Sequence, residues 1–194
     1  MEAFEYVMVL VSIIIGLAIT HVLAALGTAV HRIRGHGPPI RLGATYLLWV
    51  GFTFIWLVSF WWWEFKFQEL ELQWTFGLYL FVVGYAIWLF LMSVILVPSR
   101  LEGVENSFDY LMEMRRWFFG ALLVATAIDT IDSFLKGNAW ALRPELIAQT
   151  GVITAAAIVG MVTIRPRLQL AGAIAAFVTQ LVYMFNEVGI LGSW

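Results

Sequence analysis

The chain has 194 residues, of which 62% are hydrophobic and 12% are charged, and its formal net charge is -2. Soluble domains average about a quarter charged residues, so this composition excludes an ordinary water-soluble fold and indicates a protein solvated by lipid. The small net charge says little about partners, and no run of basic residues with interleaved aromatics points to nucleic acid, so we expect no nucleic-acid partner. The sequence has no cysteine, which excludes disulfides, iron–sulfur clusters and thiolate metal sites.

The first residues, "MEAFEY", are acidic, and basic residues appear only after the first apolar segment, at Arg32, Arg34 and Arg41. A cleaved signal peptide normally has a basic start. We therefore expect the first apolar segment to remain in the mature protein as a membrane span.

Apolar runs of about twenty residues recur along the chain, and each is long enough to cross about 30 Å of hydrocarbon as a helix. They predict an all-α integral membrane protein. We expect a bundle of six transmembrane helices forming a single domain over residues 1–194, with spans at about 6–30, 42–63, 75–97, 117–135, 146–164 and 168–188. The lipid bilayer is the first expected partner.

Basic residues alternate between the two sides of these spans. One side carries Arg32, Arg34, Arg41, Arg100, Arg115, Arg116, Arg165 and Arg167, and the other carries Lys66, Lys136 and Arg143. Cytoplasmic loops carry the excess of Lys and Arg, which predicts that both termini lie outside. We expect the membrane to be a bacterial inner (plasma) membrane.

The first span contains "LAITHVLAAL", which places Thr20 and His21 near mid-depth. His21 lies eleven residues before Arg32, or about 16 Å along a helix. Small residues recur at every fourth position of this span, at Ser12, Gly16, Thr20, Ala24 and Thr28. Such a stripe favours close packing against another helix.

The second and third spans are rich in Trp, Phe and Leu. The second ends in "WWWEF" (61–65), whose tryptophans fit an outer interfacial belt better than an aromatic binding site. We expect the first, fourth, fifth and sixth spans to form a tight core. The aromatic second and third spans would then face lipid, a second copy of the chain or a partner in a membrane complex.

Two loops on the Arg-rich side leave alternatives open. "HRIRGHGPPIR" (31–41) carries His31 and His36, which could bind a metal but are more typical of a solvated turn. The segment 98–117 has apolar residues at helical spacing among charges, so it is either a short amphipathic helix on the membrane surface or a solvated connector.

The fourth span contains "ATAIDTIDSFLKG", with two aspartates in an apolar helix. Asp132 precedes Lys136 by four residues, a spacing that suits an ion pair at the outer interface. Asp129 lies about 20 Å from Arg116, well inside the hydrocarbon, where an unpaired carboxylate is costly. His21 lies at a similar depth and is its expected partner.

The sixth span adds Gln180, Tyr183 and Glu187, which share one helix face because of their spacing. A polar layer is therefore predicted near mid-membrane, formed by Thr20, His21, Asp129, Thr154, Thr179 and Gln180. Tyr183 lies slightly farther out on the same helix face and is also expected to line the pathway, and Asp132 and Glu187 would form the outer vestibule leading to Asp129.

"LAITHVLAAL" and "TAIDTIDSFL" both place polar residues after an Ala-Ile step. If this similarity reflects a repeat, the chain consists of two inverted halves of three helices each. The second and third spans do not resemble the fifth and sixth in composition, so the expected repeat is weak.

Ionisable residues inside a membrane mark ion paths, and imidazole and carboxylate can exchange a proton. The predicted function is a proton or cation pathway, in a channel or a coupled carrier. The alternative is a non-catalytic subunit or scaffold of a larger membrane complex. No catalytic motif is present, so an enzyme is not favoured. No cofactor is expected, and a zinc site at His21, Asp129 and Asp132 would still need a fourth ligand.

Overall fold

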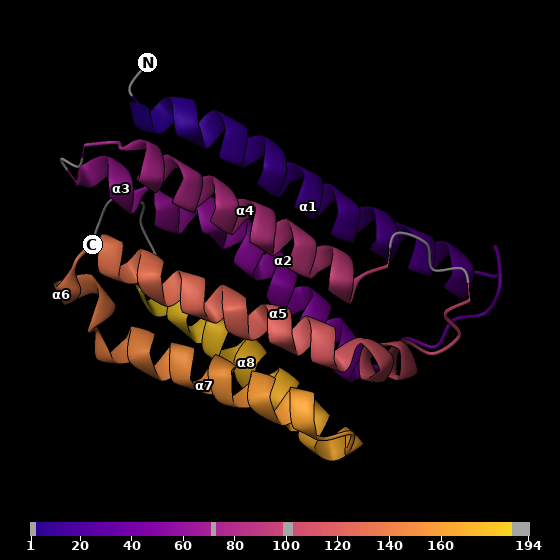
Figure 1. Ribbon diagram of the computed structural model, residues 1–194. Coiled ribbons are helices and arrows are strands. Elements are labelled where there is room, and N and C mark those ends of the chain that lie inside the picture. The colour runs from indigo at the N-terminus through magenta and orange to yellow at the C-terminus, as the bar shows by residue number, and fades with distance from the viewer. Residues whose placement is uncertain (1–2, 71–72, 99–102, 188–194) are drawn as a thin grey trace.

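The structure, a computed structural model, describes residues 3–70, 73–98 and 103–187. Within these ranges six long helices run alternately up and down a single bundle (Figure 1): α1 (Ala3–Ile33), α2 (Ala44–Glu64), α4 (Phe76–Leu96), α5 (Ser107–Leu135), α7 (Pro144–Val162) and α8 (Pro166–Glu187). All six are long and apolar enough to cross a membrane, which confirms the expectation of six long apolar helices. Two one-turn helices, α3 (Lys66–Glu69) and α6 (Asn138–Ala141), lie at the end of the bundle where α1 begins (Figure 1).

Local sequence explains where the helices begin. The Asn106 side chain caps α5 by accepting a hydrogen bond from the Phe108 amide at 3.0 Å. Thr75 caps α4 in the same way, accepting from the Leu78 amide at 3.2 Å. Proline occupies the first position of α7 and of α8, where its missing amide hydrogen has no cost.

Segment 98–117 was expected to be either a short surface helix or a solvated connector, and the structure supports neither alternative from Ser107 onward. From Ser107 onward the segment is neither a separate surface helix nor a loose connector, because it forms the first turns of α5. No proline interrupts the sequence between Ser107 and Leu135, so the helix continues without a break. Residues 99–102 lie outside the described residues.

We expected the first span to lie in the core and the second to lie outside it, and the structure shows the reverse for both. The aromatic helix α2 is central and packs against α8, α1, α5 and α4. In its most apolar stretch 56% of the residues are buried, against 33% for α1 and 28% for α8. Helix α1 is peripheral and packs mainly against α4 and α2. Large aromatic rings fill a core that small residues were expected to line.

The small-residue stripe of α1 does not pack as predicted. Ser12, Thr20, Ala24 and Thr28 are exposed, and a methyl group at Gly16 would meet nothing within 4 Å. Helix α1 instead buries its apolar face, which includes Val11, Ala18 and Val22. Small residues do bring α7 and α8 together, since a Cβ built at Gly172 would lie 3.6 Å from the Ala156 Cβ.

The two halves of the chain pack differently. In the first half α1 contacts both α2 and α4, and α4 is its main neighbour. In the second half α7 lies between α5 and α8. This packing gives the inverted repeat no support.

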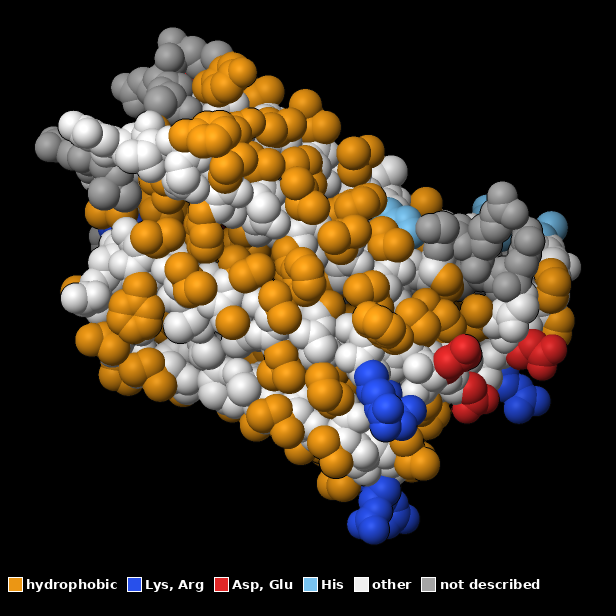
Figure 2. Space-filling model, in the orientation of Figure 1, with side chains coloured by type: hydrophobic (Ala, Val, Ile, Leu, Met, Phe, Trp, Pro, Cys, Tyr) orange, Lys and Arg blue, Asp and Glu red, His pale blue; other side chains and the backbone are white. Residues whose placement is uncertain are grey.

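The surface matches a lipid-solvated bundle. Hydrophobic side chains cover the middle of the visible face, and most of the charged side chains on that face gather at the end opposite the start of α1 (Figure 2). An apolar girdle with charges at its edge is what a bilayer-spanning protein requires.

Hydrogen bonds connect the loops at that charged end. The buried Arg32 donates to the carbonyl oxygens of Pro38 at 2.6 Å and Val104 at 2.9 Å. Arg41 and Asn106 form a short parallel bridge. The loops after α1 and α4 therefore hold each other in place.

Candidate functional site

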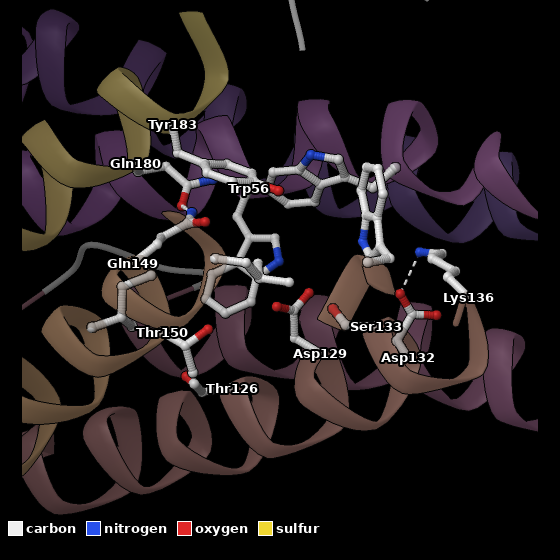
Figure 3. A pocket seen from close by; sticks show the side chains of 14 residues that line it. Trp56, Thr126, Asp129, Asp132, Ser133, Lys136, Gln149, Thr150, Gln180 and Tyr183 are labelled. Atoms are coloured by element: carbon white, nitrogen blue, oxygen red, sulfur yellow. Dashed lines mark hydrogen bonds and ion pairs between the residues drawn. The ribbon is translucent and has the colours of Figure 1, made fainter. Parts of the chain in front are cut away.

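A small polar cavity of about 20 Å³ lies between α2, α5, α7 and α8 (Figure 3). Its polar lining comes mainly from three helices: Thr126, Asp129, Asp132 and Ser133 of α5, Gln149 and Thr150 of α7, and Gln180 and Tyr183 of α8. Trp56 and Trp63 of α2, Lys136, Trp140, Leu146 and Ile153 complete the lining. A space of this volume holds about one water molecule.

Helical periodicity explains why α5 supplies so many of these groups. Thr126, Asp129 and Ser133 are spaced i, i+3 and i+7, so they lie on one face of the helix. Figure 3 shows Asp129 and Ser133 directed from α5 into the cavity. The Thr126 hydroxyl donates to the Leu122 carbonyl oxygen at 2.9 Å, which leaves its oxygen lone pairs able to accept.

Asp129 is held by a hydrogen-bond chain that crosses the bundle. The Tyr85 hydroxyl of α4 donates to Asp129 Oδ1 at 2.8 Å. The same hydroxyl accepts from the Trp56 indole Nε1 of α2 at 3.2 Å. Asp129 is therefore oriented by two neighbouring helices, and its Oδ2 has no partner among the described residues.

A buried ionic cluster closes one end of the site, on the side of the bundle where α1 begins. Lys136 Nζ donates to Glu64 Oε1 at 3.0 Å and to Asp132 Oδ2. The ammonium group also lies 4.9 Å from the centre of the Phe67 ring. Burial alone would lower the pKa of Lys136, but the two carboxylates outweigh that effect and hold its pKa above the ordinary lysine value. Lys136 is therefore a permanent positive charge here.

The predicted pairing of Asp132 with Lys136 is present, but it is not a surface contact. The side chains of Asp132 and Lys136 are 4% and 2% exposed. Local backbone geometry positions the lysine, because α5 ends at Leu135 and the chain turns at Gly137 with a φ of +124°.

The two glutamines form a second polar unit. Gln149 Nε2 of α7 donates to Gln180 Oε1 of α8 at 2.6 Å, and both side chains are buried. Their hydrogen bond lies across the cavity from α5 (Figure 3).

Several buried polar atoms around the cavity have no hydrogen-bond partner in the described part of the protein. They are Asp132 Oδ1, Gln180 Nε2 and Trp63 Nε1, together with Glu64 Oε2 beside Lys136. An unsatisfied polar atom in an apolar environment is costly. A proton, a cation or a water molecule bound in the cavity would satisfy members of this set, which mixes acceptors and donors.

The charge of the site is unbalanced. Glu64, Asp129 and Asp132 face Lys136, which is the single ammonium group of the cluster among the described residues. If all three carboxylates were ionised, the cluster would carry excess negative charge. Excess negative charge in a low dielectric attracts protons or cations.

The structure brings together only part of the predicted polar layer. Asp129, Asp132, Gln180 and Tyr183 line one cavity. Thr20 is exposed on α1, and Thr154 and Thr179, although half-buried, do not line the cavity. The Glu187 side chain lies outside the described part of the structure.

The expected partnership of His21 with Asp129 is not formed. His21 Nε2 lies 2.7 Å from the Val97 carbonyl oxygen, and because a carbonyl can only accept, Nε2 carries the proton. His21 therefore ties α1 to the end of α4, whereas Asp129 bonds to Tyr85. Depth counting placed the two residues at one level but could not show that α1 is peripheral.

Glu64, Tyr85, Trp56 and Gln149 were missed by sequence reasoning. Glu64 had a signal, because it is the acidic residue of "WWWEF" and ends its span at the same end of the bundle as Lys136. Tyr85 and Trp56 had none, since each lies in a run of other apolar and aromatic residues.

The interpretation of the Trp61–Trp63 run as an interfacial belt holds only in part. It fits Trp61, which is 40% exposed. It does not fit Trp63, which lines the cavity.

Metal ligation finds no support in the part of the chain that the structure describes. No group of three or more His, Asp or Glu side chains there could hold a metal ion. The rings of His31 and His36 pack edge to face with centroids 6.1 Å apart.

Comparison with known proteins adds no functional assignment. The chain matches no family model, and neither the curated proteins nor the solved structures include a significant match. Its class follows from the fold itself: six apolar helices make it a polytopic integral membrane protein.

Proposed function

We propose that the cavity at Asp129 and Asp132 is the central binding site of a pathway for protons or small monovalent cations. The observation that carries this proposal is that two carboxylates of a membrane-spanning helix line one water-sized cavity. Intramembrane carboxylates are costly, and ion and proton paths are among their main roles.

The size of the cavity favours a small species. A volume of about 20 Å³ accommodates about one water molecule, so a proton or a dehydrated monovalent cation fits and an organic solute does not. The lack of a three-ligand cluster among the described residues disfavours a divalent metal.

Each lining group has a role in this proposal. Asp129 is the acceptor of the proton or cation, because Tyr85 holds its Oδ1 and leaves its Oδ2 to the cavity. Asp132 leads to Asp129 from the end of the cavity nearest the ionic cluster. Gln180 supplies a neutral polar group, and Tyr183 lines the same cavity.

The test is ion flux in liposomes that contain the purified protein, measured for protons and for alkali cations. The Asp129→Asn variant keeps the shape of the side chain and removes its charge, and we expect it to abolish flux. Asp109→Asn is the matched control, because Asp109 is an exposed residue of the same helix, and it should conduct like the parent. Flux that is equal in the parent and in Asp129→Asn would refute the pathway.

A second function, a non-catalytic subunit or scaffold of a membrane complex, is favoured by a different observation. Lys136 joins Glu64 of α2 to Asp132 of α5, and Tyr85 joins α4 to α5. Such buried polar contacts fix how α2, α4 and α5 are aligned along one another, which is a purely structural role.

The central position of α2 changes where a partner would dock in this second role. The docking surface would be the exposed faces of α1 and α4 rather than the second and third spans together. A folded protein without flux in either the parent or the Asp129→Asn variant would favour this role.

A further inference from the structure

The polar side chains that α5 presents to the cavity form a row along the helix and not a shell around one point. Thr126, Asp129 and Ser133 all line the cavity, and Thr126 and Ser133 are seven residues apart. Seven residues of helix span about 10 Å, so at most one of these two hydroxyl groups can contact an ion bound at Asp129. A hard metal cation takes several oxygen ligands at once, whereas a proton is held by one acceptor at a time. The row therefore suits a proton better than a metal ion.

The carboxylate oxygens of the site are mostly occupied or closed off. Asp129 Oδ1 accepts from the Tyr85 hydroxyl at 2.8 Å, and Asp132 Oδ2 accepts from Lys136. Asp132 Oδ1 and Glu64 Oε2 are buried so completely that a water-sized species in the cavity does not reach them. Among the described residues that line the cavity, Asp129 Oδ2 is left as the single open carboxylate oxygen. One such oxygen is enough to hold a proton, but it replaces little of the hydration shell of an alkali cation.

Lys136 already supplies a cation to this site. Its Nζ lies 3.0 Å from Glu64 Oε1 and also donates to Asp132 Oδ2, and its side chain is 2% exposed. Asp132 lies three residues from Asp129 on α5, and both line the cavity. Without the ammonium group, Asp132 Oδ2 would be a second anionic ligand for a mobile cation. Lys136 therefore takes the place that a free cation would need beside Asp132.

We propose that the species held in this cavity is the proton, bound to Asp129 Oδ2, and that Lys136 keeps alkali cations out by occupying Asp132. This inference rests on the proposed pathway and decides between the two kinds of ion that the pathway could carry. Loading transfers a proton from hydronium to Oδ2, which forms an O–H bond and leaves water, and unloading reverses the transfer.

The charged and titratable groups around Asp129 come from several helices. Tyr85 of α4 bonds to it, Tyr183 of α8 lines the same cavity, and the ionic cluster lies at one end. Helix α7 presents the uncharged side chains of Gln149 and Thr150. A measurement of proton binding must therefore separate Asp129 from the carboxyl groups of the ionic cluster, which a variant of Asp129 itself allows.

The first experiment asks whether sodium competes with the proton at Asp129. Infrared spectra of the reconstituted protein are recorded from about pH 3 to about pH 9, a range that covers ordinary and buried carboxyl groups. The band of the protonated Asp129 is identified by its loss in Asp129→Asn. Sodium chloride then replaces choline chloride at constant ionic strength, and we expect the midpoint of the titration to stay unchanged. A midpoint that falls as sodium rises, or the lack of any carboxyl band that depends on Asp129, would overturn the proposal.

The second experiment frees Asp132 from its ammonium partner. Lys136→Met/Glu64→Gln removes one cation and one anion together, so the formal charge of the ionic cluster is kept. The matched control is Lys66→Met/Glu69→Gln, which removes an ion pair of the same residue types, 2.7 Å apart, at the same end of the bundle and outside the cavity.

Uptake of protons and of sodium into liposomes is measured for the parent and for both variants. We expect the parent and the control to take up protons without sodium. In Lys136→Met/Glu64→Gln sodium uptake should rise about tenfold or more, because an unpaired carboxylate within about 4 Å attracts a monovalent cation by at least that factor at an effective dielectric constant of about 20.

The outcomes separate this inference from the pathway itself. Sodium uptake by the parent as fast as its proton uptake would overturn the inference and leave a cation pathway in place. No uptake of either ion by the parent would overturn both. Sodium uptake that stays at the level of the control in a folded Lys136→Met/Glu64→Gln would overturn the role of Lys136. Helix content and thermal unfolding establish folding, and Lys136→Gln/Glu64→Gln replaces the first variant if that one does not fold.

Discussion

The Tyr85 hydroxyl donates to Asp129 Oδ1 at 2.8 Å, joining the third membrane helix to the fourth. Tyr85→Phe removes this donor and also leaves the Trp56 indole without its acceptor. We expect a loss of unfolding free energy of about 1–3 kcal/mol, because two buried polar groups lose their partner. Equilibrium unfolding in mixed micelles measures this loss, and a Tyr79→Phe variant serves as the control on the same helix.

Neutralising Lys136 should destabilise the protein more strongly. Lys136→Met leaves Glu64 and Asp132 buried without their cation, and removing one partner of a buried ion pair costs about 3–5 kcal/mol. Adding Glu64→Gln and Asp132→Asn to Lys136→Met should recover much of the lost stability, since no unpaired charge remains in the ionic cluster. A triple variant that is no more stable than Lys136→Met would contradict this account.

The stabilising effect of Lys136 should not decline as the pH rises from about 7 to about 9. Its pKa is raised in the folded state, so its contribution is complete below the unfolded value of about 10.4 and is lost only as pH rises through the folded value. The measurement is the difference in unfolding free energy between the parent and Lys136→Met across this range. A difference that shrinks toward the alkaline end would show that the lysine is not held as the structure indicates.

Gly160 is expected to tolerate no side chain. A methyl group there would overlap the ring of Phe119, which is itself fully buried against Trp49 and Phe118. Gly160→Ala should cost about 1–3 kcal/mol of unfolding free energy because the ring cannot move aside. Gly151→Ala on the same helix has nothing within 4 Å of its new methyl group, and it should be neutral or slightly stabilising in the same unfolding measurement.

His21 should matter for stability and not for flux. Its contact with the Val97 carbonyl oxygen separates it from the cavity, so His21→Gln should conduct as the parent does under conditions in which Asp129→Asn does not. Liposome flux for the two variants, measured side by side, decides the matter. Loss of flux in His21→Gln would show that His21 takes part in the pathway together with Asp129, as the sequence suggested.

The number of spans and most of their bounds could be predicted because apolar length alone determines whether a helix can cross a bilayer. The arrangement of the helices could not. In lipid an aromatic helix and a small-residue helix are similarly apolar, so composition does not tell which one lies inside. For the same reason α2 was misplaced, and Tyr85 and Trp56 were not recognised beside Asp129.

Within the site, the residues that could be predicted were those whose partners are close in sequence. Asp132 and Lys136 are four residues apart, and their pairing followed from helical spacing. Glu64 reaches Lys136 from 72 residues away, and only the fold reveals that contact. Asp129 was recognised as buried and in need of a partner, but the partner is a phenol rather than the expected imidazole.

The hydrogen bond between Gln149 and Gln180 lies entirely within the α7–α8 pair, which is joined by a short turn at residues 163–165. The loops that connect α1 to α2 and α4 to α5 are tied to one another by Arg32 and by the Arg41–Asn106 bridge, and those ties do not include this turn. A movement of the hairpin as one rigid arm would therefore leave its own amide contact intact. Such a movement would carry both glutamines away from the carboxylates at once, and it would have to separate two interfaces, the one between α5 and α7 and the one between α2 and α8.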